Sequence, residues 1–300
     1  MTDITVQSLE SGAADATRLA LRLGIPAHTI AMHRFPDTEL RVTVGPAAPT
    51  TILYASLDQP NDKLVALLFA TEALRRGGAR RLVLVAPYLC YMRQDTAFAP
   101  GEAISQAVVG RLLAGAFDRV VTVDAHLHRT SSLEAVFPGI ETLNLSAIPA
   151  IAEGVSAAGY DARTVVVGPD EESEPWARDL GARLCVDHTV ARKTRHGDRS
   201  VDITLPDPAI LAGRPAVLFD DIVSSGGTII ACARMLLAAG AARVDVVVTH
   251  ALFPPAMLDD FTEAGIGSVR STSSVPHPTN AIPLDSLLAE ALAGELVGKY

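Results

Sequence analysis

The sequence is poor in aromatic residues and has no long uninterrupted apolar run. Aromatic side chains make up 5% of the 300 residues, so we expect an aliphatic core. No segment reaches the roughly 18 consecutive apolar residues that a membrane-spanning helix needs. The first residues have no basic region followed by an apolar stretch, as a secretory signal would. We therefore predict a cytoplasmic protein with no membrane partner.

Cysteine is scarce, and basic residues are outnumbered by acidic ones. Cys90, Cys185 and Cys232 lack the spacing of a metal site and lie in apolar stretches, so we expect reduced thiols in the core. The chain has 25 Lys and Arg residues against 34 Asp and Glu residues, which gives a net charge of −9. Binding of a polyanion requires a broad basic face. The composition therefore argues against nucleic acid as a partner.

Short apolar runs alternate with helical patterns along the chain, which predicts an α/β fold with mainly parallel sheets flanked by helices. The order strand, helix, glycine-containing turn and strand occurs in both halves, first from Tyr54 to Leu82 and again from Phe219 to Val244. We therefore expect two similar domains, residues 1–146 and 147–300. The last helix, expected at residues 285–293, is predicted to pack on the first domain.

Residues 216–228 carry the clearest functional signal. An apolar run, which predicts a buried strand, leads into two carboxylates and then into a turn that opens a helix. Gly226 and Gly227 leave the backbone free to curl, so its N–H groups can face an anion at the helix N-terminus. The hydroxyls of Ser224, Ser225 and Thr228 add donors. The segment predicts a phosphate cradle, and the alternative is an ordinary capped turn.

Asp220 and Asp221 stand just before this turn, at the expected carboxyl end of the buried strand. Open α/β sheets bind their ligands at that edge. Carboxylates there are costly unless hydrogen-bond donors or a cation satisfy them. We therefore predict that the two acids hold sugar hydroxyls or a hydrated metal, and that the whole segment binds a phosphorylated sugar.

Two groups of side chains could handle a polyphosphate. Arg93 and Gln94 are expected on a loop after a buried strand, where a planar cation and an amide donor stand side by side. Lys193 and Arg195 lie two apart in the most basic run of the chain, so a short strand or hairpin would place both on one side. A solvated loop is the alternative for each group. The acidic background favours a functional role for the second group.

The segment 216–228 resembles the phosphoribosyl pyrophosphate (PRPP) motif shared by type I phosphoribosyltransferases and ribose-phosphate pyrophosphokinases. Six further segments are similar to the second family and follow its order: residues 35–39, 87–95, 101–105, 123–126, 168–170 and 193–195. Together they span nearly the whole chain. The resemblance implies two phosphoribosyltransferase-like domains.

The resemblance also implies a role for each matched residue. ATP would be bound by Phe35, Asp37, Glu39, Arg93 and Gln94, with the aromatic ring stacked on adenine and the carboxylates near its amine. The other implied roles are Mg2+ binding by His126 and Asp170, catalysis by Lys193 and Arg195, and ribose 5-phosphate binding by Asp220, Asp221, Ser224, Ser225, Gly226, Gly227 and Thr228. In this family the loop at residues 35–39 reaches the active site of a neighbouring subunit. The resemblance therefore implies a homo-oligomer with its active site near a subunit interface.

The implied reaction transfers pyrophosphate from Mg-ATP to the anomeric hydroxyl of ribose 5-phosphate and yields PRPP and AMP. Two alternatives remain open on the sequence alone. A phosphoribosyltransferase that consumes PRPP needs only the motif of the second half. A non-catalytic relative that binds nucleotide for regulation is the other alternative, and it is suggested by acids near Asp170.

The chain departs from the family pattern at several positions. Thr96 and Ala97 stand where the family usually supplies a basic residue. Glu171, Glu172 and Glu174 follow Asp170, and these acids could bind an extra cation or repel a triphosphate. The turn in the first half that corresponds to the phosphate cradle, residues 56–62, has two acids and no glycine. We therefore expect no phosphate site in the first half.

Overall fold

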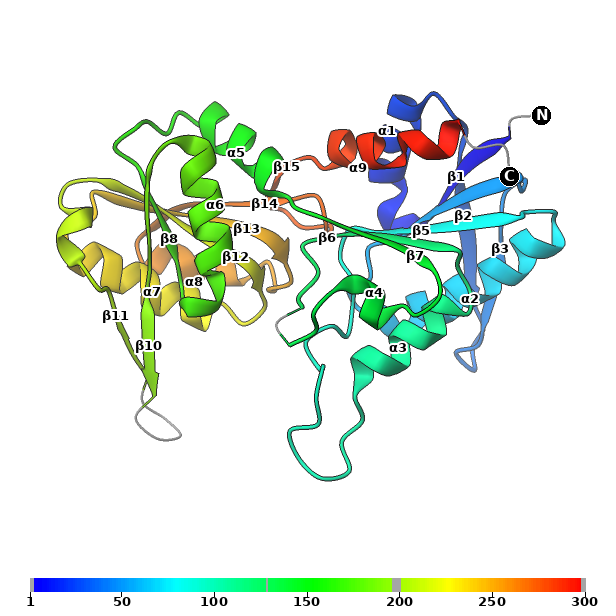
Figure 1. Cartoon of the computed structure of the whole chain (residues 1–300), viewed down its shortest axis with the longest axis horizontal. Helices are drawn as coiled ribbons and strands as arrows, with labels where there is room; N and C mark the ends of the chain where they lie inside the picture. The colour runs from blue at the N-terminus through cyan, green and yellow to red at the C-terminus, as the bar shows by residue number, and fades with distance from the viewer. Residues whose placement is uncertain (1–2, 128, 196–200, 298–300) are drawn as a thin grey trace. The chain divides into compact units, whose positions relative to one another are not determined.

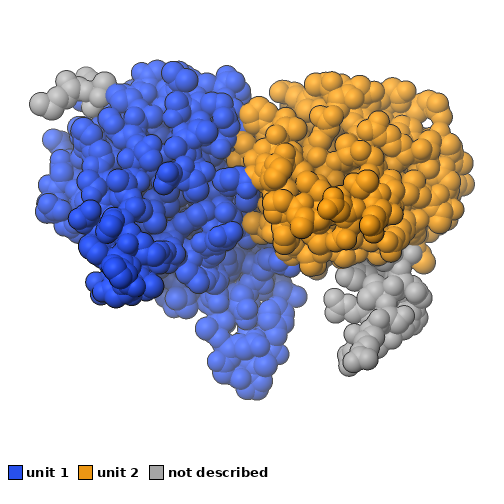
Figure 2. Space-filling view, turned by 180° about the vertical axis from the view of Figure 1, so that it is seen from behind, with its two compact units in different colours: residues 1–145, 274–276, 284–300 blue, residues 146–273, 277–283 orange. Residues whose placement is uncertain are grey.

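The computed structural model describes residues 3–127, 129–195 and 201–297, without the side chains of residues 193–195 and 201–203. The chain divides into two compact units (Figure 2). The first consists of residues 1–145, 274–276 and 284–300, and the second of residues 146–273 and 277–283. Each unit is built on a mainly parallel sheet with helices on its faces (Figure 1). The predicted α/β fold is therefore confirmed.

The sheet of the first unit has seven strands within the described residues, in the order β3-β2-β1-β4-β5-β6-β7. All neighbours are parallel except β2 and β3. The bounds are β1 Ile4–Leu9, β2 Ala27–Arg34, β3 Leu40–Thr43, β4 Thr50–Tyr54, β5 Arg81–Ala86, β6 Arg119–Val123 and β7 Glu141–Leu145. Every residue of β1, β4 and β5 is buried, as expected of strands covered on both faces.

The helices of the first unit cover both faces of this sheet. Helices α1 and α9 pack together along one face, and α2 and α3 lie along the other (Figure 1). Their bounds, with two short 3-10 helices, are η1 Glu10–Gly12, α1 Ala13–Leu23, α2 Pro60–Arg76, α3 Ser105–Ala114, α4 Leu133–Val136, α9 Asp285–Leu292 and η4 Ala293–Leu296. The core between helices and sheet is largely aliphatic, as the composition predicts.

The sheet of the second unit has six parallel strands within the described residues, in the order β15-β14-β13-β12-β8-β9. The bounds are β8 Val165–Gly168, β9 Asp187–Val190, β12 Pro215–Val223, β13 Arg243–Ala251, β14 Ile266–Thr272 and β15 Asn280–Ile282. The order from β9 to β15 repeats the order from β2 to β7 in the first sheet. The internal repeat seen in the sequence is thus a repeat of strand order.

Helices also flank the second sheet. Helix α6 packs against β8, β9 and β12, with α5 beside it, whereas α7 packs against β12 and β13 and α8 against β14. Their bounds, with two 3-10 helices, are α5 Ile148–Ala157, η2 Glu171–Ser173, α6 Glu174–Leu184, η3 Pro208–Leu211, α7 Gly227–Ala238 and α8 Met257–Glu263. A separate antiparallel pair is formed by β10 Arg192–Arg195 and β11 Val201–Thr204.

One expectation about the core is wrong. Cys90 and Cys232 are buried, but Cys185 is exposed. Helix α6 ends at Leu184, and Cys185 caps it with a left-handed backbone, so its side chain leaves the buried face of the helix. No helix among the described residues has both the length and the apolar character needed to cross a bilayer.

The two acids of the turn after β4 in the first unit form ion pairs within that unit. Lys63 Nζ lies 2.6 Å from a carboxylate oxygen of Asp58 and 2.9 Å from the carbonyl oxygen of Ser56. Arg34 pairs with Asp62. Both acids of the turn therefore have cationic partners within their own unit. The absence of a phosphate site at this turn stays a prediction.

Candidate active site

The two aspartates of the motif lie inside β12, close to its carboxyl end. The strand continues to Val223, four residues beyond the apolar run that ends at Phe219. The two residues are adjacent, and the N–H of Asp221 donates to a carboxylate oxygen of Asp220 at 3.1 Å. Asp221 is 6% exposed, and its carboxylate accepts a hydrogen bond from the N–H of Ile222 at 2.8 Å.

Asp170 follows β8, the parallel neighbour of β12, so its carboxylate lies at the same edge of the second sheet. One of its oxygens accepts a hydrogen bond from the N–H of Ser173 at 3.3 Å and caps the turn that precedes α6. The structure therefore gathers three of the predicted site residues, Asp170, Asp220 and Asp221, at the carboxyl ends of two adjacent strands.

The electrostatics of this edge are dominated by burial and by the proximity of its three acids. Burial raises the pKa of Asp220 well above that of a free carboxyl, and the charges of Asp221 and Asp170 raise it further. Burial also raises the pKa of Cys232 on α7 to about 12, with smaller contributions from Asp220 and Asp170. A cation or a set of hydroxyl donors would relieve this repulsion.

The acids suit Mg2+ better than a cation held entirely by protein. Among the described residues, no group of three or more His, Cys, Asp or Glu side chains converges into a metal site. Mg2+ keeps several water ligands and is commonly bound through one or two carboxylates and substrate phosphates. The carboxylates of the second unit fit that mode of binding.

The glycine turn after β12 leads directly into the N-terminus of α7. Gly226 has a φ of +69° and is the N-cap of α7, which begins at Gly227. A methyl group on Gly226 would lie 2.8 Å from Met257 Cε and from Phe261 Cε1, whereas one on Gly227 would have no neighbour within 4 Å. The first glycine is thus packed against α8, and the second faces open space at the positive end of a helix.

The acids after Asp170 are arranged as a helix start. Glu171 and Glu172 are exposed in η2, and Glu171 Oε1 lies 3.8 Å from Arg192 Nε. Glu174 is the first residue of α6, where a carboxylate favours the helix dipole, and it pairs with Arg178 at 3.6 Å. Glu171 and Glu174 thus each have an arginine of the same unit close by.

The basic run after β9 forms the strand β10. Lys193 pairs with Ile203 of β11, and Arg195 pairs with Val201, in an antiparallel ladder. The predicted hairpin is thus present in the backbone. The side chains of Lys193 and Arg195, and residues 196–200 of the same run, lie outside the described part of the structure.

The predicted adenine loop is the tip of the hairpin between β2 and β3. The N–H of Phe35 donates to the carbonyl of Glu39 at 2.9 Å, and that of Glu39 donates to Asp37 at 3.2 Å. The ring of Phe35 is 37% exposed, with the guanidinium of Arg41 at 5.8 Å from its centroid. Phe35, Asp37 and Glu39 are all exposed, so the loop presents them for contact.

The predicted nucleotide and metal residues of the first unit lie on two loops at the carboxyl ends of adjacent strands. Arg93 and Gln94 follow β5, and His126 follows β6, its parallel neighbour. Glu102 accepts hydrogen bonds from the side chain of Gln94 at 3.4 Å and from the N–H of Phe98 at 2.8 Å. His126 belongs to the first unit and Asp170 to the second.

The groups that support these loops are not marked by any motif in the sequence. Gln106, Met257 and Phe261 each contact a loop that carries site residues. Gln106 stands in the first turn of a helix, and Met257 and Phe261 lie four residues apart on α8. These patterns are shared by any packed helix, so no signal in the sequence separates them from ordinary core residues.

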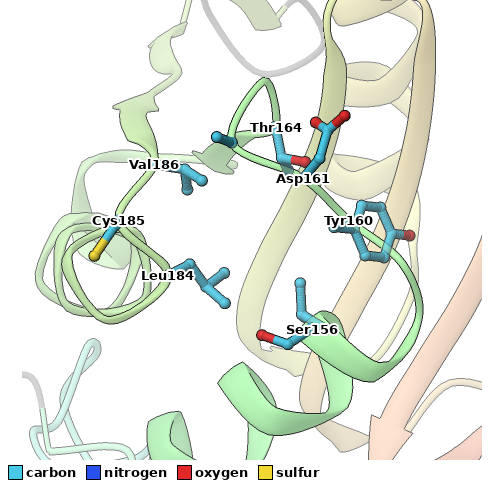
Figure 3. A pocket seen from close by; sticks show the side chains of 9 residues that line it. Ser156, Tyr160, Asp161, Thr164, Leu184, Cys185 and Val186 are labelled. Atoms are coloured by element: carbon cyan, nitrogen blue, oxygen red, sulfur yellow. The ribbon is translucent and has the colours of Figure 1, made fainter.

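A pocket of about 170 Å3 in the second unit is not the predicted sugar site (Figure 3). Thr164 and Val186 line it just before β8 and β9, so it lies at the amino ends of the strands. The acids and the glycine cradle lie at the carboxyl ends. The pocket has a carboxylate, Asp161, but no basic side chain in its lining, so it does not suit a phosphate.

Comparisons with known proteins cover both units. Residues 4–116 match the model of the N-terminal domain of ribose phosphate pyrophosphokinase, and residues 142–261 match the phosphoribosyl transferase domain. The ribose-phosphate pyrophosphokinase of Methanopyrus kandleri is 30% identical over 96% of this chain and 98% of its own. The ribose-phosphate pyrophosphokinase of Rhizobium meliloti is 33% identical over 92% of this chain and 90% of its own. Archaeoglobus fulgidus has a ribose-phosphate pyrophosphokinase 2 that is 32% identical over 92% of this chain and 95% of its own.

A solved structure shares the fold. The crystal structure of phosphoribosylpyrophosphate synthetase from Mycobacterium smegmatis superimposes with a TM-score of 0.84 and covers 99% of both chains at 23% identity. The likeness therefore extends over both units and the repeat that they form.

Proposed function

The chain belongs to the ribose-phosphate pyrophosphokinase family, and from this premise we propose how its own residues carry out the reaction. The enzyme transfers the pyrophosphoryl group of ATP to the anomeric hydroxyl of ribose 5-phosphate, which yields PRPP and AMP. The matches of both halves, over nearly the full length of the relatives, carry this conclusion. A phosphoribosyltransferase requires only the second match, so residues 4–116 favour the pyrophosphokinase.

We propose that ribose 5-phosphate binds at the carboxyl end of β12. Its phosphate would accept hydrogen bonds from backbone N–H groups at the start of α7 and from the hydroxyls of Ser224, Ser225 and Thr228. Its ribose hydroxyls would donate to Asp220 and Asp221. The open space above Gly227 and the raised pKa of the buried Asp220, which hydroxyl donors would lower, support this orientation.

We propose that ATP is bound by Arg93 and Gln94 and by the hairpin loop with Phe35, Asp37 and Glu39. Lys193 and Arg195 would stabilise the charge that builds on the transferred group. The anomeric oxygen forms a bond to the β-phosphorus while the bond from that phosphorus to the α-phosphate oxygen breaks, so AMP leaves. Positioning and charge stabilisation account for most of the rate in such transfers.

Mg2+ is the proposed cofactor, with His126 and Asp170 as its proposed protein contacts. When bound, it would neutralise charge on the ATP phosphates. An imidazole is an unusual partner for an ion that prefers oxygen, so His126 would act partly through a water molecule. The raised pKa of Asp220, due partly to Asp170, supports a cation at the second unit.

We further propose that the active form is a homo-oligomer. Apolar side chains are exposed on α2, at Val65 and Phe69, and on α3, at Val108 and Leu112. Such groups are commonly covered by a partner. A mixture of a Phe35→Ala variant with a Lys193→Ala variant should recover activity if the hairpin loop serves a neighbouring subunit. A mixture as inactive as its components would contradict that arrangement.

The function is tested by the products. The purified chain is incubated with ribose 5-phosphate, Mg2+ and ATP, and AMP and PRPP are quantified. Equal amounts of AMP and PRPP are expected. Pyrophosphate release from PRPP only in the presence of a free base would indicate a phosphoribosyltransferase. Absence of turnover with retained nucleotide binding would indicate a regulatory relative.

A further inference from the structure

One buried amide joins the two loops of the first unit that carry the proposed nucleotide and metal residues. Gln106 lies in the first turn of α3 and is 6% exposed. Its Nε2 donates to the carbonyl oxygen of Met92 at 3.3 Å, and its Oε1 accepts from the hydroxyl of Thr130 at 2.7 Å. The side chain therefore connects the loop after β5 with the loop after β6.

The backbone of the same residue strengthens the connection. The N–H of Gln106 donates to the carbonyl oxygen of Gln94 at 3.2 Å. Met92 and Gln94 flank Arg93 in the sequence, so Gln106 holds the chain on both sides of that arginine. A planar guanidinium binds phosphate well only when its orientation is fixed, because its hydrogen bonds are directional.

An ion pair makes a second connection between these loops. Arg129 Nη1 lies 3.1 Å from Asp95 Oδ1, and the backbone N–H of Arg129 donates to Asp95 Oδ2 at 3.3 Å. The carboxylate of Asp95 is 3% exposed. Asp95 follows Gln94, and Arg129 lies three residues beyond His126. Both connections thus join the same two stretches of chain.

We propose that Gln106 is a positioning residue, which holds the Arg93–Gln94 segment against the loop of His126 so that nucleotide and metal bind in one geometry. This inference rests on the proposed function of those three residues. Gln106 itself need not touch the nucleotide. Both ends of its amide bond to the protein, Nε2 to the carbonyl oxygen of Met92 and Oε1 to the hydroxyl of Thr130.

The test compares Gln106→Leu and Thr130→Val with their double variant. Leucine fills a similar volume without either hydrogen bond. We expect the Kd for Mg-ATP, measured by calorimetry, to rise about tenfold in Gln106→Leu, which corresponds to about 1.4 kcal/mol. The KM for ribose 5-phosphate should change less than about twofold, because that sugar binds at the other unit. The double variant should bind Mg-ATP no more weakly than Gln106→Leu alone. Thr130→Ser, which keeps the hydroxyl that Thr130→Val removes, should bind Mg-ATP as the wild type does.

Gln7→Leu is the matched control. Gln7 is also fully buried, with Nε2 bonded to the carbonyl of Pro46 at 3.1 Å and Oε1 to the N–H of Gly45 at 2.8 Å. It should lower the melting temperature without changing the Kd for Mg-ATP. If both leucine variants weaken ATP binding in proportion to their loss of stability, Gln106 is merely structural and the inference is wrong.

The same experiment separates this inference from the proposed function. Binding is measured without turnover, so a wild type that binds Mg-ATP but makes no PRPP would refute the function and still test Gln106. A wild type that turns over, with unchanged ATP binding in Gln106→Leu, would refute the inference alone. A wild type that does not bind Mg-ATP would refute both.

Discussion

The two glycines of the cradle should respond in opposite ways to the same substitution. An alanine at position 226 must adopt a left-handed backbone conformation, which costs about 1 kcal/mol. It must also push aside Met257 and Phe261, each 2.8 Å away, and such overpacking costs about 1–3 kcal/mol. Gly226→Ala should therefore destabilise the second unit by about 2–4 kcal/mol.

Gly227→Ala has neither cost. Its methyl group has no neighbour within 4 Å, and alanine is favoured over glycine in a helix by about 0.5–1 kcal/mol. Stability should be unchanged or slightly higher. The same methyl group would stand in the space that we assign to the phosphate, so the KM for ribose 5-phosphate should rise at least about tenfold while that for ATP stays constant.

Scanning calorimetry and steady-state kinetics on the two variants measure both effects. For domains of this size, 1 kcal/mol corresponds to about 3 °C in Tm, so Gly226→Ala should lower the transition of the second unit by about 6–12 °C. Equal stability of the two variants would show that the packing under Gly226 is unimportant. An unchanged KM for ribose 5-phosphate in Gly227→Ala would refute the cradle.

Four other variants test the charges of the two units. Asp220→Asn should abolish turnover yet raise the Tm measured without Mg2+. Because the pKa of Asp220 is raised in the folded state, its carboxylate destabilises the folded protein increasingly as the pH rises from the unfolded-state pKa through the folded-state pKa. The gain in Tm should therefore be larger at pH 8 than at pH 5, and an equal gain would contradict this expectation. Lys193→Ala should lower kcat about a hundredfold with little change in KM, and a change confined to KM would exclude its proposed role. Glu295→Gln breaks the buried ion pair with Arg81 and should lower the free energy of unfolding, measured with urea, by about 3 kcal/mol. Glu141→Gln changes a side chain that is 58% exposed and should lower it by less than about 1 kcal/mol. Similar losses in the two variants would contradict the importance of burial.

Much of the fold could be predicted because its central strands are buried on both faces. The apolar runs of β5 and β6 predict those strands at their observed bounds. The exposed, polar hairpin strand β2 and the short edge strand β15 give no such signal, because their side chains are not confined to a core. Strand β12 extends beyond its apolar run, because Asp220 and Ile222 remain paired with β13 although two adjacent aspartates are typical of a loop.

The candidate site could be predicted as a set of motifs, but its support could not. The sequence indicates the acids and the glycine turn, because residue type and spacing alone point to an anion. The sequence does not indicate that Gly226 rests on Phe261, or that Gln106 bonds to Thr130, because those contacts join segments far apart in the chain. Tertiary packing decides such contacts.

The proposed mechanism depends most on ribose 5-phosphate binding at the start of α7. A crystal structure of the protein with this sugar phosphate is the most direct measurement. We expect the phosphate against the backbone N–H groups of Gly226, Gly227 and Thr228, with the ribose hydroxyls on Asp220 and Asp221. A sugar phosphate bound elsewhere, with the start of α7 filled by the protein's own side chains, would contradict it.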